Sequence, residues 1–280
     1  MQTSKALLKK IYGRREKWSH KGQYGKLVVI AGCERHTGSA CFVGMAACRV
    51  GCDLVYVASP QRSADIAANF SPCLITEPLK GDKLETRHVK KILDMIKEVR
   101  GTAVVIGPGL WREDETNKAI VKLIDKIDLP MVIDADAIRA VAGNVKLLRK
   151  KKCVLTPHAD EFRNLTGKFV NKNLEQRIKT VKEEANKISN VIALKGSVDV
   201  ISDGKKIMLN NTGSVLMTKG GFGDTMTGIC GAYLARGNDT FLSACAAAYV
   251  NGKAGEISSR KHGEGLLPTD MLEEIVKVIK

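Results

Sequence analysis

A glycine-rich segment that ends in an aspartate is the part of this sequence best suited to chemistry. Lys219–Asp224 has three glycines in four positions, and an apolar helical pattern follows it. Glycine exposes backbone amides, and a helix start presents free N–H groups, so the segment favours an anion such as phosphate. Asp224 would repel a phosphate bound at its own position, so we expect a base aimed at a second molecule. The alternative is a glycine-rich helix start with Asp224 as an ordinary cap.

Further glycine, charged or histidine residues follow short apolar runs that are typical of parallel strands. They are Gly32, Gly107, Gly109, Asp134, Asp136, Thr156, His158, Lys195 and Gly196. Ligands of an open parallel sheet bind beyond the carboxyl ends of its strands. Any one of these residues would also suit a turn, but their joint occurrence predicts an active-site rim.

Each rim residue has a functional and an ordinary interpretation. Gly107 and Gly109 would leave a wall without side chains for a bulky group, or form a plain turn. His158 is expected to be a hydrogen-bonding group, because no second metal ligand stands at a typical spacing. Lys195 could reach a phosphate or be a surface lysine. Asp134 and Asp136 could hold Mg²⁺ through water, bind a ribose or amide, or cap the next helix.

Short apolar runs alternate with longer helical periods from residue 26 onward, which indicates βα repeats around a mainly parallel sheet. The predicted strands cover residues 27–31, 54–58, 73–76, 103–106, 131–134, 153–155 and 191–194. The predicted helices cover residues 39–50, 84–99, 115–127, 137–142, 159–165 and 174–188. A hairpin is expected at 198–202 and 206–209, and helices at 226–235, 240–258 and 269–279 should cover one side of the sheet.

Composition narrows the class of protein. With 280 residues and 44% hydrophobic content, and no linker or repeat, a single α/β domain over residues 1–280 is predicted, with a basic N-terminal helix or arm at 1–18. The net charge of +15 is not accompanied by a nucleic-acid-binding signature, and only 5% of residues are aromatic. We therefore expect no nucleic-acid partner, and interpret the charge as a field that attracts a small anionic ligand.

Membrane association and disulfides are not expected either. No window reaches the ~18 apolar residues of a membrane span, and no apolar signal core follows the basic N-terminus, which predicts a cytoplasmic protein. The 8 cysteines include no Cys-x-x-Cys pair and fall mostly in apolar stretches. They are therefore interpreted as reduced residues, most of them in the core.

Several separate motifs resemble one known family. Lys219–Gly228, preceded by Asn211-Thr212-Gly213 and by Lys195-Gly196, resembles the nucleotide-binding end of the ribokinase-like superfamily. From about residue 19 onward the chain is similar to the NAD(P)H-hydrate dehydratase family within it. The Thr-Pro-His-x-x-Glu element at Thr156–Glu161 distinguishes that family from sugar kinases, and Gly38-Ser39 matches its first glycine-rich segment.

The resemblance implies a ribokinase-like three-layer α/β/α sandwich with a mainly parallel central sheet. It also implies a lyase that repairs nicotinamide cofactors by ADP- or ATP-dependent dehydration of the S epimer of hydrated NADH or NADPH. The terminal phosphoryl group is placed on the ring hydroxyl, and elimination of phosphate restores the dihydronicotinamide. Mg²⁺ would bridge the nucleotide phosphates with no direct protein ligand, and the expected assembly is a homo-oligomer, a tetramer by resemblance.

The resemblance and the rim together predict the site residues. Asp224 would be the catalytic base. The predicted nucleotide-binding residues are Lys195, Gly196, Ser197, Val198, Asp199, Asn211, Thr212, Gly220, Gly221, Phe222 and Gly223. The predicted substrate-binding residues are Ser39, Gly107, Gly109, Asp134, His158 and Asp224.

The chain also departs from the family pattern. Ser214–Lys219 replaces the usual Asn-Pro-Gly-Met-Ala-Thr, Phe222 replaces a small residue, Ser39 an alanine, and Asn251 a common histidine. The alternative functions are a small-molecule kinase of the same superfamily acting on a vitamin-precursor alcohol, or a non-enzymatic nucleotide or nucleic-acid binder. The glycine loop suits the kinase equally well, whereas the Thr-Pro-His element favours the dehydratase.

Overall fold

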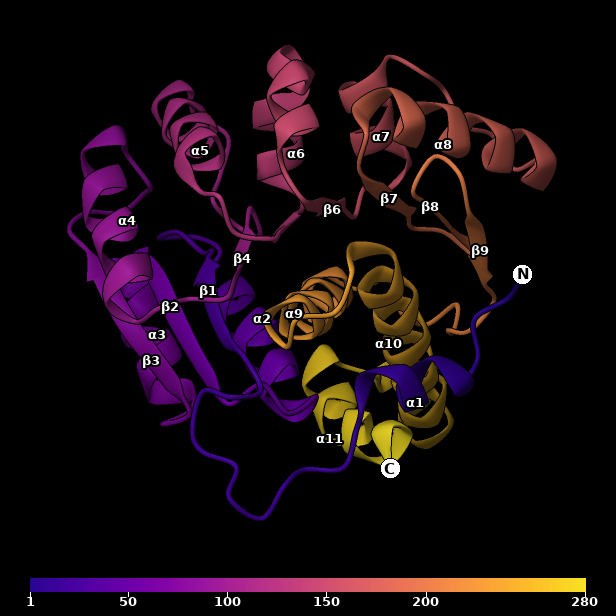
Figure 1. The fold of residues 1–280 in the computed structure, drawn as a ribbon, viewed down its shortest axis with the longest axis horizontal. Helices are drawn as coiled ribbons and strands as arrows, with labels where there is room; N and C mark the ends of the chain where they lie inside the picture. The colour runs from indigo at the N-terminus through magenta and orange to yellow at the C-terminus, as the bar shows by residue number, and fades with distance from the viewer.

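A nine-stranded sheet runs through the centre of the molecule, and the computed structural model describes residues 1–280 (Figure 1). The strands are β1 (Lys26–Ile30), β2 (Leu54–Pro60), β3 (Leu74–Leu79), β4 (Ala103–Ile106), β5 (Met131–Ile133), β6 (Cys153–Leu155), β7 (Val191–Leu194), β8 (Asp199–Ser202) and β9 (Ile207–Asn210). Their order in the sheet is β3-β2-β1-β4-β5-β6-β7-β8-β9. Neighbouring strands from β1 to β7 are parallel, whereas β8 pairs antiparallel with both β7 and β9.

Helices cover both faces of this sheet (Figure 1). They are α1 (Ala6–Ile11), α2 (Gly38–Arg49), α3 (Gln61–Phe70), α4 (Val89–Glu98), α5 (Asp114–Lys126), α6 (Asp136–Val141), α7 (Ala159–Thr166), α8 (Leu174–Ile188), α9 (Phe222–Ala235), α10 (Thr240–His262) and α11 (Pro268–Ile279), with short 3₁₀ turns at Thr86–His88, Ala142–Lys150 and Gly263–Gly265. Helices α4 to α8 lie on one face, and α2, α9, α10 and α11 lie on the other, with α1 outside α10. The predicted three-layer α/β/α fold is confirmed.

The two faces of the sheet contribute to separate hydrophobic clusters. Leu27 and Val29 of β1 pack on the α9 side, whereas Val28 and Ile30 pack on the α5 side. All of these side chains are fully buried. A parallel strand covered on both faces is apolar at every position, which explains why the unbroken apolar runs in the sequence predicted the sheet correctly.

Helices α2 and α9 approach each other closely because a glycine of α9 lies at their contact. A Cβ added to Gly228 of α9 would overlap the carbonyl oxygen of Val43 in α2. One turn further along α9, a Cβ at Gly231 would overlap the Val105 side chain of β4. Only glycine permits these two approaches, and together they fix the start of α9 beside the start of α2 and above the sheet.

Most element predictions are confirmed, although some bounds differ: β3 runs to Leu79, beyond the expected 73–76, and the helix expected at 84–99 begins at Val89. Helix α3 was not predicted, because the residues that it buries, Ser63, Ala64 and Ala67, are all small. The basic N-terminal helix is shorter than expected and spans only Ala6–Ile11. It is also docked, since Leu8 and Ile11 are buried in the core cluster that contains α10.

The first residues of the chain extend the sheet beyond β9. Gln2 forms a parallel bridge with Leu209, and the Thr3 amide donates to the Leu209 carbonyl at 2.9 Å. None of the helices is both long enough and apolar enough to cross a lipid bilayer. All 8 cysteines are free, and only Cys48 and Cys73 are not buried.

Candidate active site

The predicted rim residues meet at one edge of the sheet. Their strands, β1, β4, β5, β6 and β7, are consecutive neighbours, so their carboxyl ends form a continuous row. The strand order reverses its direction at β1. The chain first continues from β1 to β2 and β3 on one side, and then crosses to β4 on the other side of β1. Ligands of doubly wound sheets bind at such a switch point. The loops after β1 and β4 touch there, since the Gly32 amide donates to the Pro108 carbonyl at 2.8 Å.

Two helix N-termini converge on this edge and bring Ser39 to Asp224. Ser39 lies in the first turn of α2, and Asp224 lies in the first turn of α9. The Ser39 hydroxyl is close enough to lower the pKa of the Asp224 carboxyl through a side-chain hydrogen bond. The contact depends on the glycine-mediated packing of α2 against α9 described above.

The pKa of the Asp224 carboxyl is higher than that of an ordinary aspartate. Burial raises the pKa of its carboxyl from 3.8 to about 6, and the negative charge of Asp134 adds to the increase. The Ser39 hydrogen bond and the positive charge of Lys195 act in the opposite direction. A carboxyl with a pKa near 6 is mostly ionised at neutral pH and still accepts a proton more readily than an exposed aspartate.

Lys195 links the ends of three strands. Its ammonium lies 2.9 Å from Asp134 Oδ1, at the end of β5, and 3.9 Å from Glu161 Oε2, which follows β6. Burial by itself would lower the pKa of Lys195, but the two carboxylates outweigh it and raise the pKa. Lys195 is therefore a fixed positive charge, and a Cβ at Gly223 would lie only 3.5 Å from its nitrogen.

Asp134 is less accessible than the sequence suggested. Its side chain is buried, and its second oxygen, Oδ2, accepts a 2.7 Å hydrogen bond from the Thr227 hydroxyl of α9. Both carboxylate oxygens are thus engaged within the protein. In this structure Asp134 orients Lys195 and ties the sheet to α9, and Asp136 rather than Asp134 lies within helix α6, where it accepts from the Trp111 amide at 2.9 Å.

His158 is exposed at the rim but has both ring nitrogens engaged. Nδ1 accepts from the amides of Asp160 and Glu161 at 3.2 and 3.3 Å and so caps helix α7. Nε2 lies 3.2 Å from Glu161 Oε1. Burial raises the pKa of Glu161, and the positive charge of Lys195 opposes that increase. Because both of its ring nitrogens are engaged, His158 is held in one orientation.

The glycine-rich loop presents a row of backbone amides. No backbone hydrogen bond outside the regular elements is donated by residues 220–224, and the first amide of α9 with such a bond is that of Thr225, to Gly221. Free amides at the start of a 14-residue helix suit an anion. Phe222 contributes only its backbone, because its side chain is 4% exposed and lies in the core.

Asn251 and Lys219 hold this loop from behind. Asn251 Nδ2 donates to the Phe222 carbonyl at 3.2 Å, and its Oδ1 accepts from the Thr225 hydroxyl at 2.8 Å. The Lys219 ammonium donates to the carbonyls of Glu264 and Leu266 at 2.6 and 2.7 Å. Asn251 stands where the family commonly has a histidine, and Lys219 directly precedes the double glycine. Both side chains support the loop in this structure.

A buried amide that the sequence analysis missed joins the segments around Lys195. Asn210, at the end of β9, is 1% exposed. Its Nδ2 donates to Asp199 Oδ2 at 2.9 Å, and its Oδ1 accepts from the hydroxyls of Thr212 and Thr3 at 2.8 and 2.6 Å. Asp199 in turn accepts from the Gly196 amide at 2.9 Å. Asn210 thus connects the 195–199 segment, the 210–213 loop and the N-terminal residues.

The structure brings most predicted residues together, but not all by their side chains. Ser39, Gly109, Asp224, Gly223, Lys195, Asp134 and His158 form one connected group through the contacts above and through Gly109, whose added Cβ would lie 2.7 Å from Ser39 Oγ. Gly107 completes the wall, since a Cβ there would overlap the Asp134 carbonyl oxygen. Ser197, Asn211 and Gly220 are exposed and contact none of this group through a side chain.

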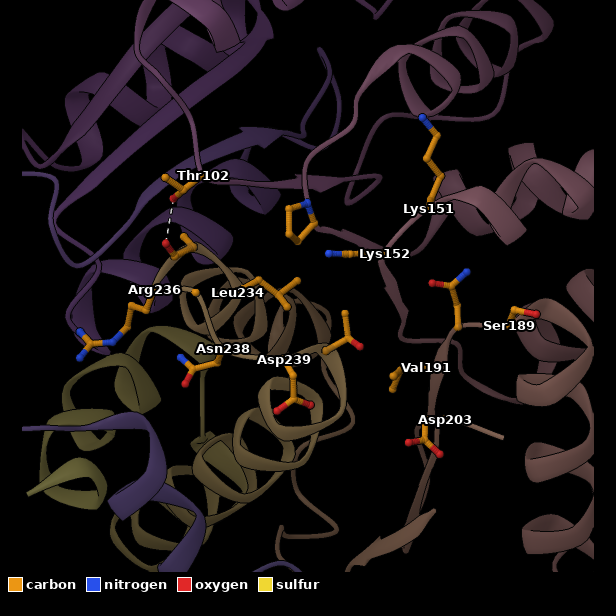
Figure 2. Close-up of a pocket in the computed structure, with 15 residues that line it drawn as sticks. Thr102, Lys151, Lys152, Ser189, Val191, Asp203, Leu234, Arg236, Asn238 and Asp239 are labelled. Atoms are coloured by element: carbon orange, nitrogen blue, oxygen red, sulfur yellow. Dashed lines mark hydrogen bonds between the residues drawn. The ribbon is translucent and has the colours of Figure 1, made fainter. Parts of the chain in front are cut away.

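A separate cavity of about 640 Å³ lies at the opposite, amino-terminal edge of the sheet (Figure 2). Its lining includes Lys152, Asp203 and Asp239. None of the predicted site residues lines it. Many of its polar side chains already bond within the protein: Asn190, for example, donates to the Leu148 carbonyl at 2.7 Å, and Asn238 to that of Tyr233 at 2.9 Å. This cavity is therefore separate from the rim residues.

The comparison with known proteins agrees with the geometry of the rim. A family model described as NAD(P)H-hydrate dehydratase (Carb_kinase) matches residues 27–277. The chain belongs to the NAD(P)H-hydrate dehydratase family. The resemblance noted in the sequence is thereby confirmed.

Relatives within the family are of two lengths. The chain is 36% identical to an ADP-dependent (S)-NAD(P)H-hydrate dehydratase of Cenarchaeum symbiosum, over 98% of this chain and 94% of that protein. It is 39% identical to a bifunctional NAD(P)H-hydrate repair enzyme of Pyrobaculum aerophilum, over 94% of this chain and 52% of that protein. The chain thus spans about half the length of the bifunctional relatives of the family.

Solved structures support the ribokinase-like fold of this NAD(P)H-hydrate dehydratase family member. A ribokinase-like superfamily protein from Enterococcus faecalis matches with a TM-score of 0.83 at 21% identity, covering 99% of this chain and 94% of that one. The ADP/ATP-dependent NAD(P)H-hydrate dehydratase from Bacillus subtilis, co-crystallised with ATP/Mg²⁺, matches with a TM-score of 0.79 at 24% identity, covering 99% and 98%.

Proposed function

We propose that this chain catalyses the ADP- or ATP-dependent dehydration of the S epimer of hydrated NADH or NADPH. The observation that carries the proposal is the position of Asp224. It lies on a helix N-terminus lined by free amides, its pKa is raised by burial to about 6, and Ser39 and Lys195 flank it. A base beside an anion-binding loop suits the transfer of a phosphoryl group to a hydroxyl.

In the first step Asp224 takes the proton of the ring hydroxyl as the oxygen attacks the terminal phosphorus of the nucleotide. The bond from that phosphorus to its bridging oxygen breaks, and AMP or ADP leaves. The amides of residues 220–223 and the Lys195 ammonium would stabilise the negative charge that develops on the transferring group. Ser39 would orient the Asp224 carboxylate toward the hydroxyl.

In the second step the ring carbon–oxygen bond breaks and phosphate departs with the bonding electrons. The departing phosphate takes the proton from the neighbouring ring carbon, and the ring double bond forms. Gly107 and Gly109 would offer the ring a backbone surface at the end of β4. A Cβ at either position would overlap the protein itself, at the Asp134 carbonyl oxygen or beside the Ser39 hydroxyl, so both glycines keep the loop packed against its neighbours. His158, fixed by Glu161, would hold the bound substrate in place.

Lys195, Gly196 and Asp199 would hold the nucleotide together with the glycine loop, and Asn210 would keep their segment in register. Mg²⁺ would enter with the nucleotide, held by its phosphates and neutralising their charge. The engagement of both Asp134 oxygens within the protein supports this arrangement.

The test is the rise of dihydronicotinamide absorbance when purified protein, Mg²⁺ and hydrated NADH are mixed with ADP or with ATP. We expect a nucleotide-dependent rise that is lost in Asp224→Asn, and the nucleotide giving the faster rise identifies the preferred donor. Repeating the assay with hydrated NADPH gives the substrate preference. No rise with either nucleotide, despite nucleotide binding, would favour the small-alcohol kinase, whose phosphorylated product persists.

We also propose that the protein assembles as a homotetramer, on the basis of the family resemblance alone. Light scattering coupled to gel filtration measures the mass directly. A mass of about one chain in solution would contradict the proposal.

A further inference from the structure

Trp111 has a backbone conformation that tryptophan rarely adopts. Its φ angle is 74°, in the left-handed region. Bulky side chains are disfavoured there, and such positions are usually glycine. Three other non-glycine residues have positive φ. Arg100 and Ser189 lie within two residues of the ends of α4 and α8, where this conformation is common, and Ala135 is the N-cap of α6. Trp111 instead lies in the loop after β4, at the rim.

The surroundings hold Trp111 in this conformation. Its amide donates to Asp136 Oδ2 at 2.9 Å, which fixes the loop to the start of α6. Its ring packs against the His36 imidazole, with a centroid distance of 5.0 Å and a tilt of 38°. The Arg35 guanidinium lies 5.2 Å from the centre of the indole ring. Residues held in a strained conformation by several contacts cluster at ligand sites.

This group, which we call the indole wall (Arg35, His36 and Trp111), adjoins the substrate side of the rim. A Cβ at Gly109 would lie 2.9 Å from His36 Cβ and 2.7 Å from Ser39 Oγ, so the wall and the Ser39–Asp224 pair share one boundary. Arg35 and His36 are exposed, and Trp111 is half-buried. The wall therefore lies at the mouth of the site, outside the place where Asp224 acts.

We propose that the indole wall is the subsite for the adenosine half of the hydrated dinucleotide, with the purine stacked on Trp111 and a phosphate paired with Arg35. The inference rests on the proposed function, which places the reacting ring at Asp224. A dinucleotide whose reacting ring lies there must extend outward, and its remaining parts are two riboses, two phosphates and a purine. A cation and an aromatic face side by side match the phosphates and the purine.

The chain offers a second arginine for the same purpose. Arg112 follows Trp111 directly, its side chain is 65% exposed, and its only ion pair is a 3.4 Å contact with Asp136. Arg35, over the indole ring, and Arg112, next to Trp111 in the chain, are both exposed and add positive charge at the mouth of the site. That positive charge complements the pyrophosphate. Internal packing does not explain where these arginines lie, because their side chains are exposed.

The decisive experiment compares two probes by calorimetry: NADH, and reduced nicotinamide mononucleotide, which lacks the adenosine monophosphate half. In Trp111→Gly we expect the affinity for NADH to fall about tenfold, within the range for stacking of a base on an aromatic side chain. Affinity for the mononucleotide should not change. Trp111→Phe, which keeps a ring, should retain most of the NADH affinity.

Thermal unfolding separates binding from a structural role. Trp111→Gly places glycine where φ is positive, so its melting temperature should be unchanged or higher while NADH affinity falls. The matched control is Trp18→Phe, because the chain has 2 tryptophans and Trp18, 88% exposed, is the other one. Trp18→Phe should bind both probes as the wild type does, and it leaves Trp111 as the sole tryptophan, whose fluorescence NADH should quench.

Three results would overturn the inference. These are unchanged NADH affinity in Trp111→Gly, an equal loss for NADH and the mononucleotide, and no NADH binding by the wild type. Because the probes are bound and not converted, the outcome is separate from that of the proposed function. Absent turnover of hydrated NADH with NADH affinity still dependent on Trp111 would refute the reaction and leave the subsite standing.

Discussion

Asp224→Asn replaces the proposed base by a group of the same shape that accepts no proton. We expect the turnover of hydrated NADH to fall by a factor of ~10² to 10⁴, the usual contribution of a positioned base. Affinity for ADP and ATP should change little, because the loop amides and Lys195 remain. The exposed Asp128, at the opposite edge of the sheet and 95% exposed, provides the matched control, and Asp128→Asn should have wild-type activity.

The pKa of about 6 fixes the pH dependence that accompanies this loss. The base must be ionised, so about nine-tenths of the enzyme is active at pH 7 and about one-tenth at pH 5, with kcat/KM falling about tenfold for each unit below 6. Ser39→Ala removes a hydrogen bond that lowers this pKa. The acid limb of Ser39→Ala should therefore lie at a higher pH than that of the wild type.

Stability should change in the opposite direction from activity. Folding raises the pKa of Asp224 from 3.8 to about 6, so the folded state binds this proton more tightly than the unfolded chain. Ionised Asp224 thus destabilises the fold above pH 6, by at most about 3 kcal/mol, and the effect fades as pH falls from 6 to 4. Asp224→Asn should melt at a higher temperature than the wild type at pH 7.5, and at a similar one at pH 4.

The assay is the initial rate of dihydronicotinamide formation at low substrate from pH 5 to 8.5, with calorimetry for nucleotide affinity. A wild-type kcat/KM that is flat across this range would refute the assignment of a base with a raised pKa. So would an acid limb that persists unchanged in Asp224→Asn. A parallel loss of nucleotide binding in that variant would show that Asp224 serves the pocket, with no separate role in proton transfer.

Three further substitutions test the parts of the structure around this base. Gly223→Val would cover the loop amides, so ADP and ATP should bind at least ~10-fold more weakly by calorimetry; equal binding would exclude the loop from the nucleotide site. Asn210→Asp should raise the KM for nucleotide. Asn190→Asp, also at a buried position but at the amino-terminal edge of the sheet, should lower only the melting temperature, and similar effects of the two changes on KM would contradict the positioning role. Gly107→Ala should lower the free energy of unfolding in urea by at least ~2 kcal/mol, because the added Cβ overlaps a carbonyl oxygen. Gly143→Ala, at a position with open space, should leave it unchanged. An unchanged free energy in Gly107→Ala would show that the backbone around residue 107 can shift to accept the side chain.

The sequence was sufficient for the parts of the fold that repeat a strong physical pattern. Strands buried on both faces are apolar at every position, and the helices between them, such as α5 and α8, have a clear apolar stripe. Helix α3 was harder to recognise because the buried face of the helix holds only small residues, Ser63, Ala64 and Ala67. Small residues are compatible with helix, turn or strand, and only the space between α2 and β3 selects the helix.

The placement of candidate site residues could be predicted only where the local sequence pattern decides it. Asp224 and the glycines of its loop, which lie at the start of α9, are of this kind. The sequence could not decide between Asn210 and Asn211. The choice depends on the register of β9, which buries the Asn210 side chain and leaves that of Asn211 in solvent. The pairing of Lys195 with Asp134 was equally hidden, since the two residues directly follow β7 and β5, which are separated in the sheet by β6.

That pairing explains how one site can favour both an anion and a base. A lysine and a helix N-terminus beside Asp224 would by themselves lower its pKa and weaken it as a base. Here the charge of Lys195 is shared with Asp134 and Glu161, so its effect on Asp224 is outweighed by burial and by the charge of Asp134. The Lys195 ammonium still lies at the edge of the loop, where a phosphate would meet it together with the free amides. The buried carboxylates thus keep Asp224 basic while the loop remains a place for phosphate, and phosphoryl transfer to a hydroxyl needs both at once.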